Sequence, residues 1–264
     1  MFLEALHSLW SDQVEWALWI FLWLLGNTLA LYLGLQSNSL AERFRKVPIL
    51  DFWVAVFVWL PPLFSALYMG IAGFLVSVVT QSIYLAIFCR IHSWLAYLRS
   101  GSQGGRLLKV LGSSVGTVKV LAGFYFTLLA LPCFLVVRFG QIFLYPLLQF
   151  SLGFPRYIHS DFIQVSRHKF QGLVGIDLLW CLYCEWAAGV YSLGGEMVRN
   201  NESFWCPIRF YENKHCENCR VDFPDLAEWI PSDGKMEAVE NLLQKKYPKD
   251  RKVRAWYQHP SRRA

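Results

Sequence analysis

Two cysteine pairs are the residues of this sequence whose type and spacing could do chemistry. Cys181 and Cys184 form a C-x-x-C pair in WCLYCEW, and Cys216 and Cys219 form a second pair in HCENC. The two-residue gap lets both sulfur atoms of a pair reach one metal ion at about 2.3 Å, so two pairs can complete a tetrahedral zinc or iron site. The same thiols could instead form a redox disulfide or stay unligated.

A further cysteine, Cys206, lies between the two pairs and widens the set of possible ligands. Five of the seven cysteines lie between residues 181 and 219, and this clustering favours a bound metal over redox or unligated thiols. Zinc is favoured, with iron as the alternative. The ligands could be the two pairs, or Cys181, Cys184 and Cys206 with one of Cys216, Cys219, His215 and His168.

The first pair lies in a segment with helical periodicity, from Gly175 to Asn200, which we expect to end near Arg199 in the turn-forming RNNES. Buried carboxylates on such a helix need partners. Asp177 and Glu185 could support a metal site from outside its coordination sphere, or could form ordinary ion pairs with Arg167, Lys169 or Arg199. Steps of three, four and seven residues give the helix one polar face, formed by Asp177, Cys181, Cys184, Glu185 and Ser192.

Composition places these residues in a membrane protein. Hydrophobic residues make up 55% of the 264-residue chain and aromatic residues 17%, more than a soluble domain of this length shows. Residues 1–154 carry 14 charged side chains and residues 155–264 carry 30. We therefore predict an all-α, polytopic membrane protein, with a transmembrane helical domain at residues 1–154 and a small, Cys-rich, mainly helical domain at residues 155–264.

Uncharged runs define four expected membrane spans, at about residues 16–36, 50–68, 70–90 and 119–137. The second and third spans share one uncharged run of 38 residues, 52–89, and we expect them to form a tight helical hairpin. Pro132 is expected to kink the fourth span, which Arg138 ends. Residues 139–154 would then be a re-entrant or interfacial segment, or a fifth span. The hairpin run also holds Pro61, Pro62, Gly70 and Gly73.

Basic residues in short loops predict the orientation, because such loops stay on the cytoplasmic side. The N-terminus should then face outward, and the basic tail after Lys245 and the free thiols favour a cytoplasmic C-terminal domain. We also expect an amphipathic helix from Asp233 to about Lys246 in that domain. The basic loop residues are Arg43, Arg45 and Lys46, and then Arg90, Arg99, Arg106, Lys109 and Lys119.

The expected partners follow from the same charges. The basic tail suits a solvated end or the anionic headgroups of the lipid bilayer, and it lies in no nucleic-acid-binding motif. We therefore expect contact with lipid and with a protein partner or a second copy of the chain, and no nucleic acid.

Three segments in order, HSDFIQVSRHK, WCLYCEW and ESFWCPIRF, resemble a set of uncharacterised bacterial membrane-associated proteins. In those proteins a segment with basic residues and histidine precedes a C-x-Y-C motif, and an E-x-x-W-C-P-I-[K/R] motif follows. The resemblance covers about residues 155–210. It implies a bacterial cytoplasmic membrane and that Cys181, Cys184 and Cys206 act as one unit, with His168 as a companion. The later HCENC lies outside the pattern.

Three functions are consistent with the sequence. The first is an integral membrane protein with a thiolate metal site in its cytosolic domain, acting as an accessory, assembly or partner-docking subunit. The second is a membrane-bound redox protein or enzyme with an iron-thiolate or dithiol centre. The third is metal handling or transport, although the spans are nearly free of ionisable groups.

No catalytic residue is identified by the sequence. It lacks the nucleophile elbow, the phosphate loop, the dinucleotide fingerprint and the H-E-x-x-H motif. His159 and His168 could each act as a base or a ligand.

Overall fold

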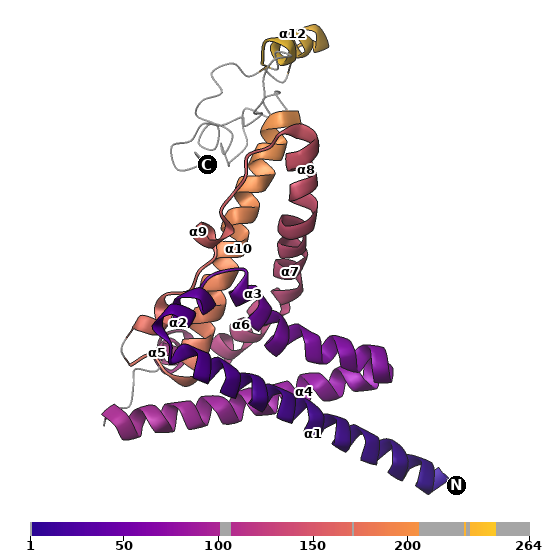
Figure 1. The fold of residues 1–264 in the computed structure, drawn as a ribbon, viewed down its shortest axis with the longest axis vertical. Coiled ribbons are helices and arrows are strands. Elements are labelled where there is room, and N and C mark those ends of the chain that lie inside the picture. The colour runs from indigo at the N-terminus through magenta and orange to yellow at the C-terminus, as the bar shows by residue number, and fades with distance from the viewer. Residues whose placement is uncertain (1, 101–106, 171, 206–229, 231–232, 247–264) are drawn as a thin grey trace. The chain divides into compact units, whose positions relative to one another are not determined.

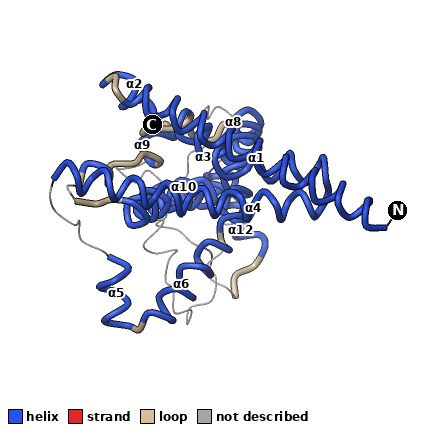
Figure 2. The backbone as a smooth tube through the Cα atoms, turned by 90° about the horizontal axis from the view of Figure 1, so that it is seen from below, coloured by secondary structure: helices blue, strands red, loops and turns tan. Residues whose placement is uncertain are grey.

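The computed structural model describes residues 2–100, 107–170, 172–205, 230 and 233–246. Every regular element in these ranges is a helix, as Figure 2 shows, apart from one isolated β-bridge between Lys46 and Gln164. The predicted all-α class is therefore confirmed for the described residues. The helical elements, labelled in Figure 1, belong to two compact units.

Unit 1 consists of Met1–Phe126 and Ile163–Trp186, and unit 2 of Thr127–Phe162 and Ala187–Ala264. The predicted domain boundary between residues 154 and 155 stays a prediction. The elements of unit 1 are α1 (Phe2–Leu35), α2 (Asn38–Phe44), α3 (Ile49–Val54), the π-helix η1 (Ala55–Trp59), α4 (Leu60–Ser100), α5 (Leu107–Val115), most of α6 (Thr117–Leu129), the 3-10 helix η3 (Arg167–Lys169) and the first part of α10 (Gly175–Trp205).

A helical hairpin forms the centre of unit 1. α4 breaks at Gly70, whose φ of 64° lies in the left-handed region that glycine tolerates. Its first limb comprises α3, η1 and α4 up to this break, and its second limb is the rest of α4. The limbs run antiparallel, because Gly73 faces Ser65 near the turn while Gln81 bonds Phe57 further along. The hairpin expected in residues 52–89 is confirmed.

The two prolines of the first limb explain one of the contacts between the limbs. Pro61 and Pro62 have no amide hydrogen, so the carbonyls four residues earlier, at Phe57 and Val58, lose their helical donors. Gln81 Nε2 from the second limb donates to these two oxygens, at 2.7 and 3.4 Å. One side chain thus donates to two carbonyls that lack their helical donors, which matters where no water is available.

A substitution tests this role of Gln81. Gln81→Leu keeps the size of the side chain but leaves the Phe57 carbonyl without this donor, so we expect a loss of about 1–3 kcal/mol of unfolding free energy. Thermal unfolding in detergent measures the loss. The neighbouring Ser82→Ala, which removes only an exposed hydroxyl, is the control and should change little. Equal stability of the two variants would contradict the role.

α1 packs along both limbs of the hairpin. Trp16 Nε1 donates to Ser65 Oγ at 2.8 Å and Trp23 Nε1 donates to Val56 O at 3.3 Å, so α1 is antiparallel to the first limb. Tyr84 of the second limb donates to Leu24 O at 3.2 Å. Ile20, Leu24 and Tyr84 form the buried core of this three-helix arrangement, surrounded by Trp16, Phe21, Phe57 and Phe88.

Three helical stretches are long and apolar enough to cross a membrane: Ser11–Leu35, Ile49–Arg99 and Thr117–Leu152. The second contains the hairpin. Many large apolar side chains of these stretches are exposed on the molecule, such as Leu67, Ile71 and Phe126. Exposed apolar surface of this extent fits contact with lipid rather than with water.

Unit 2 contains α7 (Leu131–Phe139), the π-helix η2 (Gly140–Leu144), α8 (Tyr145–Leu152), α9 (His159–Phe162), the second part of α10 and α12 (Met236–Lys246). The helix is interrupted at Ala130, next to Pro132, where a kink was expected. Helical structure then continues through Arg138 and Gly140 to Leu152. Crossing of a membrane by residues 139–154 stays a prediction.

Both predicted C-terminal helices are present, but α10 is longer than expected. It continues through RNNES to Trp205 instead of ending near Arg199. Asn side chains favour turns when they bond nearby backbone, yet Asn200 donates to two tyrosines and Asn201 accepts from Trp205. α12 begins at Met236 rather than Asp233.

Candidate functional site

The cysteine pair of α10 lies in unit 1, as two half-buried free thiols one helical turn apart. Burial raises the pKa of the Cys184 thiol, and the nearby Arg167 lowers it by less. A protonated thiol at neutral pH differs from the reactive thiol of a redox C-x-x-C, whose pKa is lowered. The predicted helical location of this pair is confirmed.

Asp177, one turn before Cys181, is bonded to the backbone of a neighbouring helix. Its side chain is buried, and its carboxylate accepts hydrogen bonds from the first two amides of α5, Leu107 N at 3.0 Å and Leu108 N at 3.3 Å. A carboxylate at a helix N-terminus satisfies free amides and meets the positive end of the helix dipole. The partner is thus backbone, not one of the basic side chains considered from sequence.

Glu185, on the other side of the cysteine pair, is also bonded to backbone amides. It accepts hydrogen bonds from Ser166 N at 2.8 Å, Ser166 Oγ at 2.5 Å and Arg167 N at 3.0 Å, where η3 begins. Partial burial acts to raise the pKa of Glu185, but these bonds and the Arg167 charge together hold the pKa below its usual range. Both carboxylates on the polar face of α10, Asp177 and Glu185, therefore hold neighbouring segments of unit 1 in place.

The lowered pKa of Glu185 predicts a pH-dependent stability. A depressed folded-state pKa contributes stability above the usual glutamate value, and this contribution is lost as the pH falls through the folded-state pKa. We expect the wild type to unfold at a higher temperature than Glu185→Gln at pH 7, with the gap closing below about pH 4. Thermal unfolding in detergent across this pH range measures it.

The control for this experiment is Glu42→Gln, because Glu42 is a largely exposed acid of the same unit, 3.6 Å from Lys46. An exposed pair of this kind contributes little. A gap for Glu185→Gln that does not change with pH would contradict the proposed anchoring.

His168, in η3, is the one histidine of the predicted ligand set that the structure describes. Its Nε2 is buried and has no hydrogen-bond partner among the described residues. Burial, and then the charges of Arg45 and Lys169, lower the pKa of His168, so the imidazole is neutral at neutral pH. A neutral imidazole is the form that binds metal.

The structure brings together only part of the predicted ligand set. Among the described residues, no three His, Cys, Asp or Glu side chains form a group that could hold a metal ion. The predicted ligands Cys206, His215, Cys216 and Cys219 lie outside the described residues. Cys181, Cys184 and His168 are all described, so His168 does not complete a three-ligand group with the α10 thiol pair.

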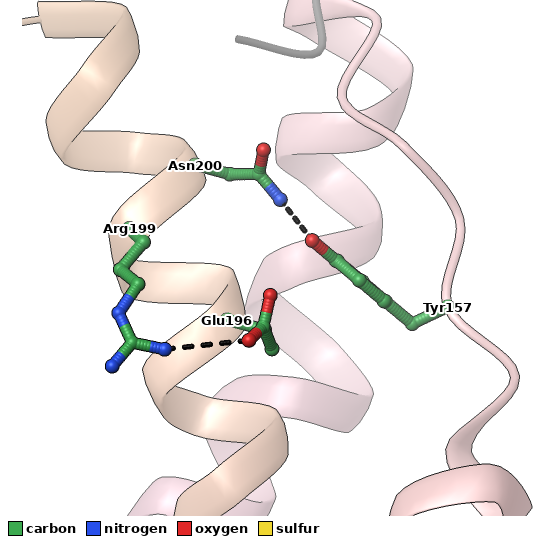
Figure 3. Close-up of polar contacts among 4 residues, drawn as sticks. All are labelled: Tyr157, Glu196, Arg199 and Asn200. Carbon is green, nitrogen blue, oxygen red and sulfur yellow. Dashed lines mark hydrogen bonds and ion pairs between the residues drawn. The ribbon is translucent and has the colours of Figure 1, made fainter. Parts of the chain in front are cut away.

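A second group of polar residues, which we call the unit 2 polar cluster, was not predicted as a site, although its member His159 was considered as a base or ligand. Figure 3 shows part of it, with Asn200 donating to the Tyr157 hydroxyl and Arg199 paired with Glu196 at 3.3 Å on α10. Asn200 also donates to Tyr145 OH at 3.3 Å and is 1% exposed. The full cluster is Arg138, Gln141, Tyr145, Tyr157, His159, Glu196, Arg199 and Asn200.

Arg138 is the residue by which sequence could have found this cluster. It is the only charged residue between Lys119 and Arg156, within a stretch apolar enough to span a membrane. Its side chain is buried, lies 3.1 Å from His159 Nδ1 and donates to Gln141 Oε1 at 2.9 Å, while Gln141 donates to Val190 O on α10 at 2.6 Å. These bonds hold α7 and η2 against the second part of α10.

Comparison with known proteins gives no match to any family model, curated protein or solved structure.

Proposed function

We propose that this chain is an integral membrane protein that holds one metal ion, zinc or alternatively iron, through the thiolates of Cys181 and Cys184. The observation that carries the proposal is the position of two free thiols at steps of three within a helix. In the proposed function the metal site is structural, and the domain around it docks a protein partner as an accessory or assembly subunit.

Helix geometry favours a metal over a disulfide between these thiols. Residues three apart on a helix have Cβ atoms about 5–6 Å apart, whereas a disulfide needs about 3.5–4.5 Å. Two sulfur ligands of a tetrahedral zinc ion lie about 3.8 Å apart, and side-chain rotation bridges the remaining difference. The raised pKa of Cys184 also fits a ligand whose proton a metal displaces, rather than a redox thiol.

The other ligands would come from two sources. His168 is one candidate, because its buried Nε2 has no partner among the described residues and its ring is neutral at neutral pH. It forms no three-ligand group with the thiol pair in the structure, so it would have to move to bind the same metal. The remaining candidates are Cys206, His215, Cys216 and Cys219, in the segment after α10. Because Asp177 and Glu185 are engaged by backbone amides, they would support the site by fixing α10 and η3 rather than as ligands.

The topology is part of the same proposal. The chain would cross the bacterial cytoplasmic membrane four or five times, with the N-terminus outside and residues 155–264 in the cytoplasm. Support comes from the three apolar helical stretches, the hairpin that divides the second of them, and the basic loops that flank them. A cytoplasmic location keeps thiols reduced and available to a metal.

Metal analysis of the detergent-purified protein, together with its absorption spectrum, tests the proposal. We expect about one metal ion per chain. A colourless protein with zinc supports the structural site. Iron with a thiolate charge-transfer band would favour the redox function over the docking function. A metal-free protein that also binds no zinc on titration would overturn the proposal.

A further inference from the structure

α5 is an amphipathic helix whose apolar stripe stays largely exposed in the part of unit 1 that the structure describes. Leu107, Leu111 and Val115 follow one another at steps of four and form one stripe, and Val110 borders it. All four side chains are between 47% and 62% exposed. Lys109 lies on the opposite side of the helix and is also exposed.

The position of α5 in the chain brings it to a membrane surface. It lies between two of the stretches apolar enough to span a membrane, Ile49–Arg99 and Thr117–Leu152. Nine residues extend for only about 14 Å, too short to cross a hydrocarbon core of about 30 Å. Gly116, with a φ of 103°, ends the helix, and α5 and α6 meet there at an angle, as Figure 2 shows. α5 is thus suited to lie in the plane of the interface beside α6.

The charges around α5 have a single sign. From Arg90 to Lys119 the chain carries only basic residues and no acid: Arg90, Arg99, Arg106, Lys109 and Lys119. Basic side chains next to a membrane are attracted to anionic lipid headgroups by about 1 kcal/mol each. The acid nearest to α5 in the described contacts, Asp177, accepts hydrogen bonds from its first two amides and so fixes the start of the helix.

We propose that α5 is an interfacial helix that binds the anionic surface of the membrane in which the protein is embedded. Its stripe of Leu107, Leu111 and Val115 enters the boundary between headgroups and acyl chains, while Lys109 and the flanking Lys119 contact lipid phosphates. Asp177 orients the helix from α10. This role does not depend on a bound metal.

Cysteine labelling on opposite faces of α5 tests the proposal in the full-length protein. Leu111→Cys and Lys109→Cys form the matched pair, reconstituted in nanodiscs of phosphatidylcholine with or without phosphatidylglycerol. A membrane-impermeant maleimide is applied, and mass spectrometry of the α5 peptide measures labelling at each introduced thiol separately from the native cysteines. The labelling rates of both introduced thiols are also measured in the digested protein, where both are in water. These rates correct for the intrinsic reactivity of each thiol.

We expect Leu111→Cys to label about tenfold more slowly than Lys109→Cys in nanodiscs that contain phosphatidylglycerol. Without phosphatidylglycerol this protection should fall at least about fivefold, because both lysines lose their anionic headgroups. Adding Lys109→Gln and Lys119→Gln to Leu111→Cys should remove the dependence on phosphatidylglycerol.

Three results would overturn the proposal. Equally fast labelling of both positions would place α5 in water, and equally slow labelling would place it under protein. Protection that is the same with and without phosphatidylglycerol would show that the helix does not recognise anionic lipid. None of these results bears on metal content, so failure here is separate from failure of the metal site.

Discussion

Replacing Gly73 with alanine is expected to lower the unfolding free energy of the protein by about 1–3 kcal/mol or more. A Cβ atom at this position would lie 2.7 Å from Met69 Cβ and closer still to the carbonyl oxygen of Ser65. Ser65 is fully buried, and its hydroxyl bonds Pro61 O at 2.6 Å and accepts from Trp16. Because the obstacle is backbone, a side-chain rotation cannot relieve it, and the two limbs of the hairpin must separate.

Thermal unfolding in detergent measures this loss, with Gly26→Ala as the matched control. Gly26 is a helical glycine of the same unit, with nothing within 4 Å of an added Cβ. Alanine there should be neutral or stabilise the helix by up to about 1 kcal/mol. If Gly73→Ala unfolds at the same temperature as Gly26→Ala, the limbs do not approach each other at Gly73 and this packing of the hairpin is wrong.

The double substitution Cys181→Ser and Cys184→Ser is expected to remove the metal, from about one ion per chain to less than about a tenth. Serine keeps the size of the side chain but is a poor ligand for zinc or iron. Metal analysis of wild type and variant, purified in parallel, measures the loss. If the site is structural, the variant should also lose resistance to proteolysis after α10, since metal binding and folding are coupled.

Two controls separate metal loss from general misfolding. Cys133→Ser changes an exposed free thiol of α7, outside the cysteine cluster, and should keep the metal. Chelation of the wild type followed by zinc should remove and then restore the proteolytic resistance, with no substitution involved. A double variant that retains its full metal content would show that other residues bind the metal, and would contradict the proposed role of Cys181 and Cys184.

The contacts of Asp177 and Glu185 explain why the two thiols of α10 keep their positions in unit 1 without a metal. Each carboxylate is anchored by amides at a helix start, α5 for Asp177 and η3 for Glu185, and the two anchors lie on either side of the cysteine pair. The rings of Trp180 and Phe124 of α6 pack at a tilt, with their centroids 4.3 Å apart. These contacts fix the cysteine pair within unit 1.

Much of the fold follows from local sequence. Long uncharged runs predict the apolar helices because backbone polar groups in lipid must be bonded within a helix. The hairpin follows from an uncharged run about twice one span, with glycines at its middle. The helical periodicity from Gly175 onward placed Cys181 and Cys184 on one face, and this holds in the structure.

Other features depend on residues far apart in the chain. Gln81 serves carbonyls 23 and 24 residues away, and Asp177 accepts from amides 69 and 70 residues away. From sequence, Asp177 and Glu185 could equally have paired with arginine or lysine, because periodicity shows which face a side chain occupies but not what faces it. The extension of α10 beyond Arg199 has the same origin, since the tyrosines that bond Asn200 lie 43 and 55 residues earlier.

The sequence by itself therefore determined the helical class, the apolar stretches, the hairpin and the clustering of the thiols, because each is a property of local composition and periodicity. Tertiary structure alone decided that Asp177 and Glu185 of α10 bond backbone amides. It also decided that Gln81 replaces the donors missing at Pro61 and Pro62, and that Arg138 is buried. In each case the reason is that a buried polar group must find a partner, and only the packing of distant segments shows which partner is within reach.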